Sequence, residues 1–332
     1  MEGRELVKQA IRFERPERIP VQYPYDWRES DIVNVEVMRY LMGPDKRHAE
    51  WGFDWAHLEN ELTMGQPLAA PLADWHALDG YPAPDLQAPG RFELMHKLKA
   101  ELGEAKYYKA NMVLTGFGVM SCLRGFPQLM EDLYLERENV ERLADLVFGF
   151  EEQLIRLLRA EGFDAVSLAD DWGTQQSLFI SPAMWREVFK PRYQHQIELA
   201  HDCGLDVYFH CCGYIYDIIP DFIEIGLDML NPGQPDINGI ERMGQDFSGR
   251  LCFACPVSYQ TTGITGCPED IRREVDELVA CLGNRGGGLI GVVPTDLAGL
   301  GAAAGNARTM LDAWRSGYSR KGGAANRQTN SD

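Results

Sequence analysis

The sequence contains no long apolar run, and it has far fewer basic residues than acidic ones. No segment approaches the ~20 consecutive apolar residues of a membrane-spanning helix, and residues 1–20 are charged and helix-patterned, unlike a signal peptide. Basic side chains number 32 against 50 acidic ones, and the formal net charge of −18 would repel the phosphates of nucleic acid. We therefore expect a cytoplasmic protein that binds neither nucleic acid nor membrane.

A dinucleotide-binding glycine motif is also missing. No predicted strand leads into G-x-G-x-x-G, and the glycines of "NRGGGLIG" at 284–291 precede a strand, as in a helix-to-strand turn. The eight cysteines occur without secretory features and are expected to be reduced thiols. Cys252 and Cys255 form a C-x-x-C within the strand-like "RLCFACP", which argues against a redox pair because such a pair opens a helix.

What is present is an alternation of short apolar runs and amphipathic stretches from about residue 105 onward, which is typical of β/α units. The helix candidates are 126–135, 137–161, 181–203, 214–225, 237–246, 268–283 and 305–317. Six strand candidates accompany them: "YYKANMVLTG", "FDAVSLADD", "LDVYFHCC", "LDMLNPGQ", "RLCFACP" and "GGLIGVVPTD". A strand in "RIPVQYPYD" and at least one in the irregular region 50–104 bring the number to about eight.

This count predicts an α/β fold of the (β/α)8 barrel class, with a doubly wound sheet as the alternative. We expect one domain over 1–318 with N-terminal helical and irregular additions. The polar tail 319–332 is expected to be disordered.

Polar residues gather where the predicted strands end, which is where barrels place their chemistry. These residues are Asp170, Asp171, His210, Cys212, Asn231, Gln234, Cys255, Ser258, Thr295 and Asp296.

His210 and Cys212 are two residues apart on an extended segment, so both side chains point to the same side while Cys211 faces away. Imidazole and thiolate are preferred zinc ligands, but a zinc site needs three or four ligands. A packed thiol beside a hydrogen-bonded histidine is the alternative. Asp170 and Asp171 fit acid–base catalysis, metal binding or capping of the following loop.

Four segments of the chain resemble the uroporphyrinogen decarboxylase-like superfamily. They are "MEGRELVKQAIRFERPERIPV", "ADDWGTQQSLFISPAMWREVFKPRY", "DVYFHCCGYIYDIIPDFIEIGLDMLNPGQP" and "TGCPEDIRREVDELVACLGNRGGGLI". The resemblance implies a (β/α)8 barrel and one of two chemistries. One branch decarboxylates uroporphyrinogen without a cofactor, and the other transfers methyl groups with corrinoid proteins and zinc.

The decarboxylase branch carries an arginine-rich motif after its first strand. This chain instead reads "YPYDWRESD" at 23–31, where Arg28 is the only basic residue. A substrate with eight carboxylates needs cationic partners, so the missing arginines argue against uroporphyrinogen. Decarboxylation remains the second hypothesis, with Asp171 or Asp26 stabilising a protonated intermediate.

The methyltransferase branch is matched by "HCCG", so the resemblance implies that His210 and Cys212 bind zinc. The branch's third ligand is a cysteine at the end of the last strand, where this chain has Asp296 and, as a weaker candidate, Thr295. Cys255 is the alternative third ligand, and Asp170 or Asp171 a fourth.

The leading hypothesis is thus a zinc-dependent methyltransferase that moves a methyl group between a small substrate and a corrinoid (cobalamin) protein. Catalytic roles are expected for Asp170 and Asp171, and a homodimer is a further expectation. The expected substrate-binding residues are Asn231, Gln234, Asp26 and His57. A third hypothesis is a non-catalytic barrel that binds a small molecule or a corrinoid.

Overall fold

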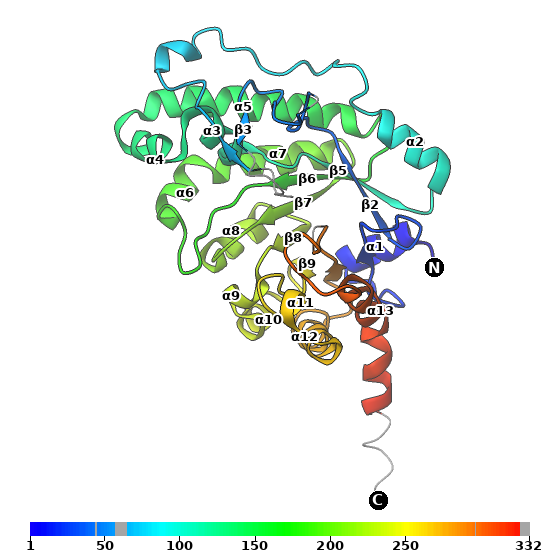
Figure 1. Ribbon diagram of the computed structural model, residues 1–332. Coiled ribbons are helices and arrows are strands. Elements are labelled where there is room, and N and C mark those ends of the chain that lie inside the picture. The colour runs from blue at the N-terminus through cyan, green and yellow to red at the C-terminus, as the bar shows by residue number, and fades with distance from the viewer. Residues whose placement is uncertain (44, 57–64, 296, 326–332) are drawn as a thin grey trace, which may run out of the picture.

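Eight parallel strands form the centre of the molecule, and helices surround them (Figure 1). The computed structural model describes residues 1–43, 45–56, 65–295 and 297–325. The barrel strands are β1 (Val21–Gln22), β2 (Ile32–Glu36), β5 (Tyr107–Asn111), β6 (Ala165–Ala169), β7 (Asp206–Cys211), β8 (Met229–Pro232), β9 (Cys252–Pro256) and β10 (Leu289–Val292). Their order is β1-β10-β9-β8-β7-β6-β5-β2, and neighbouring strands are parallel. The predicted (β/α)8 barrel is confirmed.

The helices follow the strands along the chain and cover the outside of the barrel (Figure 1). They are α1 (Gly3–Ile11), α2 (Glu93–Leu102), α3 (Gly116–Arg124), α4 (Phe126–Leu135), α5 (Arg137–Leu158), α6 (Pro182–Val188), α7 (Lys190–Asp202), α8 (Ile219–Glu224), α9 (Pro235–Asn238), α10 (Ile240–Phe247), α11 (Thr262–Thr265), α12 (Pro268–Cys281) and α13 (Asn306–Ala325). Two short 3₁₀ helices (Trp75–Leu78 and Tyr216–Ile218) and a hairpin of β3 (Trp55–Ala56) with β4 (Gln66–Pro67) complete the described elements.

Alternation along the strands divides the core into two layers. Inward side chains such as Ile32, Tyr107 and Met229 form a cluster inside the barrel. Val7 and Ala10 of α1 close this cluster at the amino-terminal ends of the strands. Side chains of the opposite parity, such as Phe209 and Phe253, pack against the helices in a larger outer cluster. Because parity decides the layer, each polar residue on a strand points either into the barrel or toward the helices.

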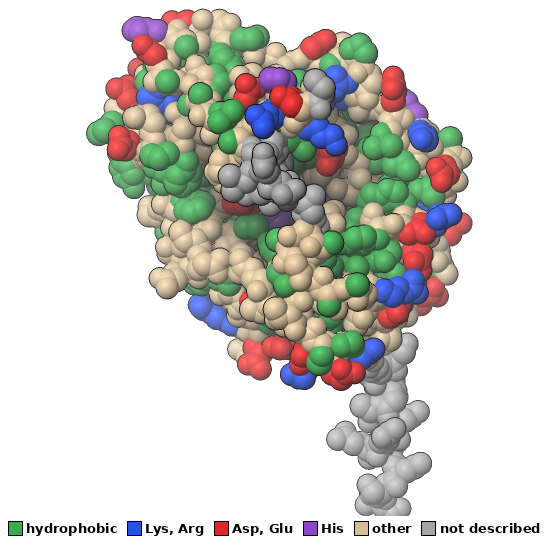
Figure 2. Space-filling model, viewed as in Figure 1, with side chains coloured by type: hydrophobic (Ala, Val, Ile, Leu, Met, Phe, Trp, Pro, Cys, Tyr) green, Lys and Arg blue, Asp and Glu red, His purple; other side chains and the backbone are tan. Residues whose placement is uncertain are grey.

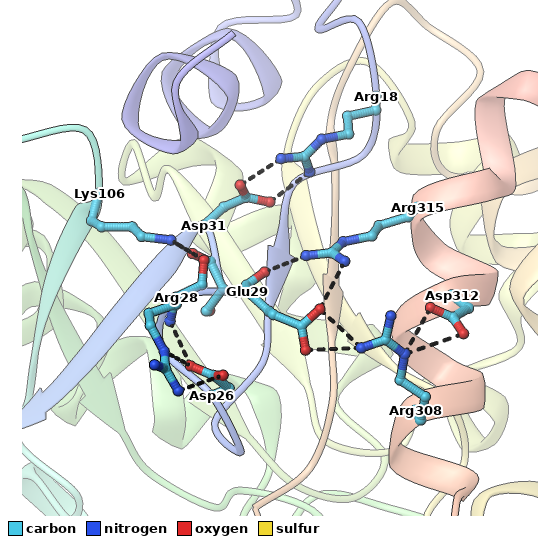
Figure 3. A network of polar contacts seen from close by, with 10 residues as sticks. Arg18, Asp26, Arg28, Glu29, Asp31, Lys106, Arg308, Asp312 and Arg315 are labelled. Carbon is cyan, nitrogen blue, oxygen red and sulfur yellow. Dashed lines mark hydrogen bonds and ion pairs between the residues drawn. The ribbon is translucent and has the colours of Figure 1, made fainter. Parts of the chain in front are cut away.

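The two end strands β1 and β2 meet at a seam that side chains close (Figure 3). Asp31 lies directly before β2, and its carboxylate accepts two hydrogen bonds from Arg18 at 2.7 Å and one from the Val21 backbone N–H at 2.9 Å. The carboxylate of Glu29 pairs with Arg308 and Arg315 of α13. The segment between β1 and β2 is therefore held by Arg18 near the N-terminus of the chain and by the C-terminal helix α13.

Several sequence-based boundaries were wrong. The second barrel strand is β2, which precedes the region 50–104 where it was expected, and helix α3 was not predicted. The expected helix 181–203 is divided into α6 and α7 around Phe189, because Pro191 begins a new first turn. Helix α13 extends to Ala325, and residues 326–332 lie outside the described chain, so the disordered tail stays a prediction. No helix within the described ranges is long and apolar enough to cross a membrane.

Candidate metal and substrate site

The end of β7 and the loops beside it bring together three side chains of types that can bind a metal ion. Atoms of Asp171, His210 and Cys212 all lie within 4.8 Å of one another. Nε2 of His210 is 3.3 Å from Sγ of Cys212 and 3.7 Å from Oδ1 of Asp171. Cys211, which lies between His210 and Cys212, is buried in the outer cluster, as the alternation predicts. The three side chains therefore converge on one point at the carboxyl end of the sheet.

A neighbouring asparagine fixes the orientation of the His210 ring. Asn231 donates its side-chain N–H to the Ala254 carbonyl, so its oxygen faces His210 and accepts the Nδ1–H at 2.6 Å. This hydrogen bond leaves Nε2 directed toward Cys212 and Asp171. A metal-binding histidine is normally held by such a partner on its other nitrogen.

Hydrogen bonds from backbone N–H groups to side chains hold the loops of Cys212 and Asp171 together. The backbone N–H of Cys212 donates to Oδ1 of Asp171 at 2.8 Å, and that of Gly213 donates to Oε1 of Gln234 at 2.6 Å. Gly213 has φ +81°, and a Cβ there would lie 2.1 Å from the carbonyl oxygen of Gly173. Glycine is required at this crossing because no side chain fits between the two loops.

The electrostatic environment follows from this crowding. Burial disfavours the charged imidazolium, but the Cys212 sulfur, Asp171 and Asn231 outweigh it and raise the pKa of His210 to about 9. Tyr259 places its hydroxyl 3.5 Å from Sγ of Cys212, and burial together with that sulfur raises the pKa of Tyr259. Without a cation, the acidic and thiol groups of the cluster favour a proton on His210.

A cavity of about 380 Å³ opens beside this cluster and extends into the barrel. Its polar lining comes from successive strands: Gln22, Asn34, Lys109, Asn111, Ser167, Tyr208, His210 and Asn231. A second cleft of about 810 Å³ shares His210, reaches Asp171, and has an apolar wall that includes Phe117, Phe126 and Phe179. Figure 2 shows the viewed face hollowed near its centre. The metal-ligating cluster thus lies where two cavities meet.

The family model of uroporphyrinogen decarboxylase (URO-D) matches residues 63–288. The chain belongs to the URO-D family. A methyltransferase from Methanosarcina mazei has the same fold, with 17% identity, a TM-score of 0.73 and coverage of 96% of this chain and 99% of that chain. D-psicose 3-epimerase matches with 12% identity, a TM-score of 0.46 and coverage of 89% of each chain. A search of the curated proteins found no match.

In this URO-D family member, Asp170 and Asp171 lie in different surroundings. Asp170 is buried and accepts hydrogen bonds from the backbone N–H groups of Phe117 and Gly118 and from the hydroxyl of Tyr193. Burial raises the pKa of Asp170 well above its ordinary value, although these donors oppose the shift. Asp171 instead points toward His210 and lines the apolar cleft.

The other sequence-based candidates are dispersed. Asp26 pairs with Arg28 (Figure 3), and both residues line a hollow that is separate from the cluster. Cys255 is fully buried in the outer cluster and is not brought together with His210 and Cys212. Asn231 lines the barrel cavity, whereas Gln234 is buried and holds Gly213. His57 and Asp296 lie outside the described residues.

Sequence reasoning missed the residues deeper in the cavity because it considered only strand ends. Lys109 lies in the middle of β5, and Asn111 follows two positions later on the same face. A lysine within the apolar run "YYKAN" is a signal that could have been used, since unpaired lysines are rarely buried. Tyr259 gave no comparable signal, because it follows β9 in an irregular segment.

Proposed function

We propose that this member of the URO-D family is a zinc-dependent methyltransferase that moves a methyl group between a small substrate and a corrinoid (cobalamin) protein. The observation that carries the proposal is the convergence of Asp171, His210 and Cys212 within 4.8 Å at the mouth of the cavities. The methyltransferase from Methanosarcina mazei, which has the same fold, supports the reaction class.

The donor set suits zinc. Nitrogen, sulfur and oxygen ligands are all common for this ion, and in a tetrahedral site two such ligand atoms are ~3.5 Å apart. The 3.3 Å between Nε2 of His210 and Sγ of Cys212 and the 3.7 Å from Nε2 to Oδ1 of Asp171 agree with that spacing. Asp171 is therefore our candidate for the third ligand. Asp296, the ligand expected from the resemblance, remains an alternative for a further position.

Zinc bound there would act as a Lewis acid on the thiol or other heteroatom of the substrate and lower its pKa. The protein would do the rest by positioning. Asn231 keeps Nε2 of His210 aimed at the cluster, and Gln234 keeps the Cys212 loop in place. The apolar cleft beside Asp171 would give the corrinoid-bearing partner its approach.

Decarboxylation of uroporphyrinogen is disfavoured by the charge of the cavities. Among the described residues that line the barrel cavity and the apolar cleft, Lys109 is the only lysine or arginine. A substrate with eight carboxylates would leave most of its charges unpaired there, which is costly in a desolvated site.

The proposal is tested by zinc analysis of the purified wild-type protein and of His210→Ala, Cys212→Ser and Cys211→Ala. We expect about one zinc per chain in the wild type and in Cys211→Ala, whose side chain faces the outer cluster, and little zinc in the other two. Transfer of the methyl group from methylcobalamin to thiols, followed by absorbance, should be lost with the zinc. A metal-free wild type that is fully active would refute the proposal.

A further inference from the structure

Lys109 is a buried cation for which the described residues provide no anionic partner. Its side chain lines the barrel cavity, the residue is only 2% exposed, and its Nζ lies 3.3 Å from the centroid of the Tyr208 ring. It forms no ion pair with any carboxylate in the described parts of the chain. Burial alone lowers the pKa of Lys109 to about 7. A cation–π contact compensates only part of the cost of burying an ammonium group.

Two amide side chains in the same cavity are also unsatisfied. Oε1 of Gln22 and Oδ1 of Asn34 are buried and have no hydrogen-bond partner among the described residues. Buried polar atoms in native proteins are nearly always paired, so two unpaired oxygens in the cavity that Lys109 also lines require an explanation. A carboxamide that rotates by half a turn presents its NH₂ in place of its oxygen, so both groups can donate to a ligand.

The pocket formed by Lys109, Gln22 and Asn34 lies in the same cavity as His210. Tyr208 and His210 are two residues apart on β7 and line the same cavity. The Lys109 ammonium group lies over the Tyr208 ring. Two residues of a strand span ~6.6 Å. A ligand with a chain of three or four atoms between its ends would therefore reach from one group to the other.

We propose that the pocket formed by Lys109, Gln22 and Asn34 binds a carboxylate group of the substrate, while the reacting heteroatom of the same molecule reaches His210 and Cys212. This inference rests on the proposed function and narrows its substrate to small singly charged carboxylates. One cation matches one carboxylate, and the carboxamides would supply the remaining donors. In a protein with a net charge of −18, an unpaired buried lysine is a specific attraction for such a ligand.

The test compares butyrate with butyramide, which has a similar shape and no charge. Dissociation constants are measured by ligand-observed NMR titration on the full-length wild type, Lys109→Met, and His210→Ala. We expect the wild type to bind butyrate at least ~10-fold more tightly than butyramide, since a charge-assisted hydrogen-bond pair in a desolvated site contributes this much or more. Lys109→Met should bind the two equally, and His210→Ala should keep the preference.

The His210→Ala arm separates this inference from the zinc proposal, because it lacks a zinc ligand and keeps the pocket. If Lys109→Met loses the preference for butyrate and His210→Ala keeps it, the result supports carboxylate binding in this pocket whether or not zinc is bound. Equal binding of the two probes by the wild type, or an unchanged preference in Lys109→Met, would overturn the inference.

A stability measurement tests whether Lys109 has a structural role instead. Lys109→Met should unfold at a urea concentration equal to or higher than the wild type at pH 7, because it removes an uncompensated buried charge. From pH 7 to about 10 the folded wild type loses the Lys109 proton while the unfolded chain retains it. The free energy of unfolding of the wild type should therefore rise relative to that of the variant as the pH increases. A variant less stable than the wild type across this range would show that the lysine supports the fold, and would contradict the proposal.

Discussion

Gly233 directly follows β8 and lies against the candidate metal site of Asp171, His210 and Cys212. A Cβ at this position would be 2.7 Å from Sγ of Cys212, 3.0 Å from the Tyr259 hydroxyl and 3.3 Å from Cε1 of His210. Contacts of 2.7 Å do not occur for real Cβ atoms, so an added methyl group would displace the thiol. Absence of a side chain at Gly233 is thus part of the geometry of the site.

Gly233→Ala is expected to lower zinc affinity about tenfold or more while the barrel still folds, as supporting residues of metal sites typically do. Zinc affinity is measured by competition with a chromophoric chelator. Gly149→Ala is the matched control, because a Cβ on Gly149, within α5, meets nothing within 4 Å. It should leave zinc binding unchanged and stabilise the helix slightly. Equal zinc affinity in both variants would show that the cluster adjusts freely.

At the scale of elements, the end of β6 carries two aspartates with separate tasks. Asp170 receives N–H groups from the first turn of α3, and Glu151 of α5 accepts another from Gly116 at 2.7 Å. Both carboxyl groups accept hydrogen bonds at the N-terminus of α3, although burial raises the pKa of Asp170 and raises that of Glu151 to about 8. They fasten α3 over the barrel, whereas Asp171 points toward His210.

Asp170→Asn should consequently affect stability, and Asp171→Asn should affect zinc binding. Asparagine at 170 provides one acceptor for donors that now share two oxygens, so we expect a loss of about 2–3 kcal/mol in the free energy of unfolding. Asparagine at 171 should leave that free energy nearly unchanged but weaken zinc binding. Urea unfolding and zinc titration on both variants measure the two effects. If Asp170→Asn lost zinc without losing stability, Asp170 would be the ligand.

The alternation of strand residues made part of this site predictable from the sequence. It correctly assigned Cys211 to the outer layer, and it could have placed Lys109 and Asn111 inside the barrel. The contact between Asp171 and Cys212 was not predictable in the same way, because it depends on two loops crossing at Gly173 and Gly213. Local pattern determines which face a residue occupies, whereas the meeting of loops depends on the whole barrel.

The same limit applies to the fold. Long amphipathic helices such as α5 were predictable because their apolar period continues over many turns. Strand β2 was missed because "IVNVE" directly follows the charged segment "RESD". Its pairing with β5, which the sequence pattern does not contain, makes it the second strand of the barrel.

At the scale of the whole molecule, closure of the barrel depends on the seam between β1 and β2. Asp31 has a side chain only 7% exposed and binds both Arg18 and the backbone of Val21, so it joins the two end strands directly. Asp26 lies in the same segment, but its partner Arg28 is exposed and belongs to the same loop (Figure 3). The two aspartates therefore form a matched pair that differs in whether the contact crosses the seam.

Asp31→Asn is expected to lower the free energy of unfolding by about 2–3 kcal/mol, because Arg18 would lose its charged partner in a partly buried position. Asp26→Asn should leave the urea midpoint unchanged, since exposed pairs within one loop contribute little. Because the seam completes one continuous sheet, Asp31→Asn should shift the whole transition, and fluorescence and circular dichroism should give the same lower midpoint. Separate transitions by the two probes would instead indicate that the barrel opens locally at β1 and β2 before the remaining strands unfold.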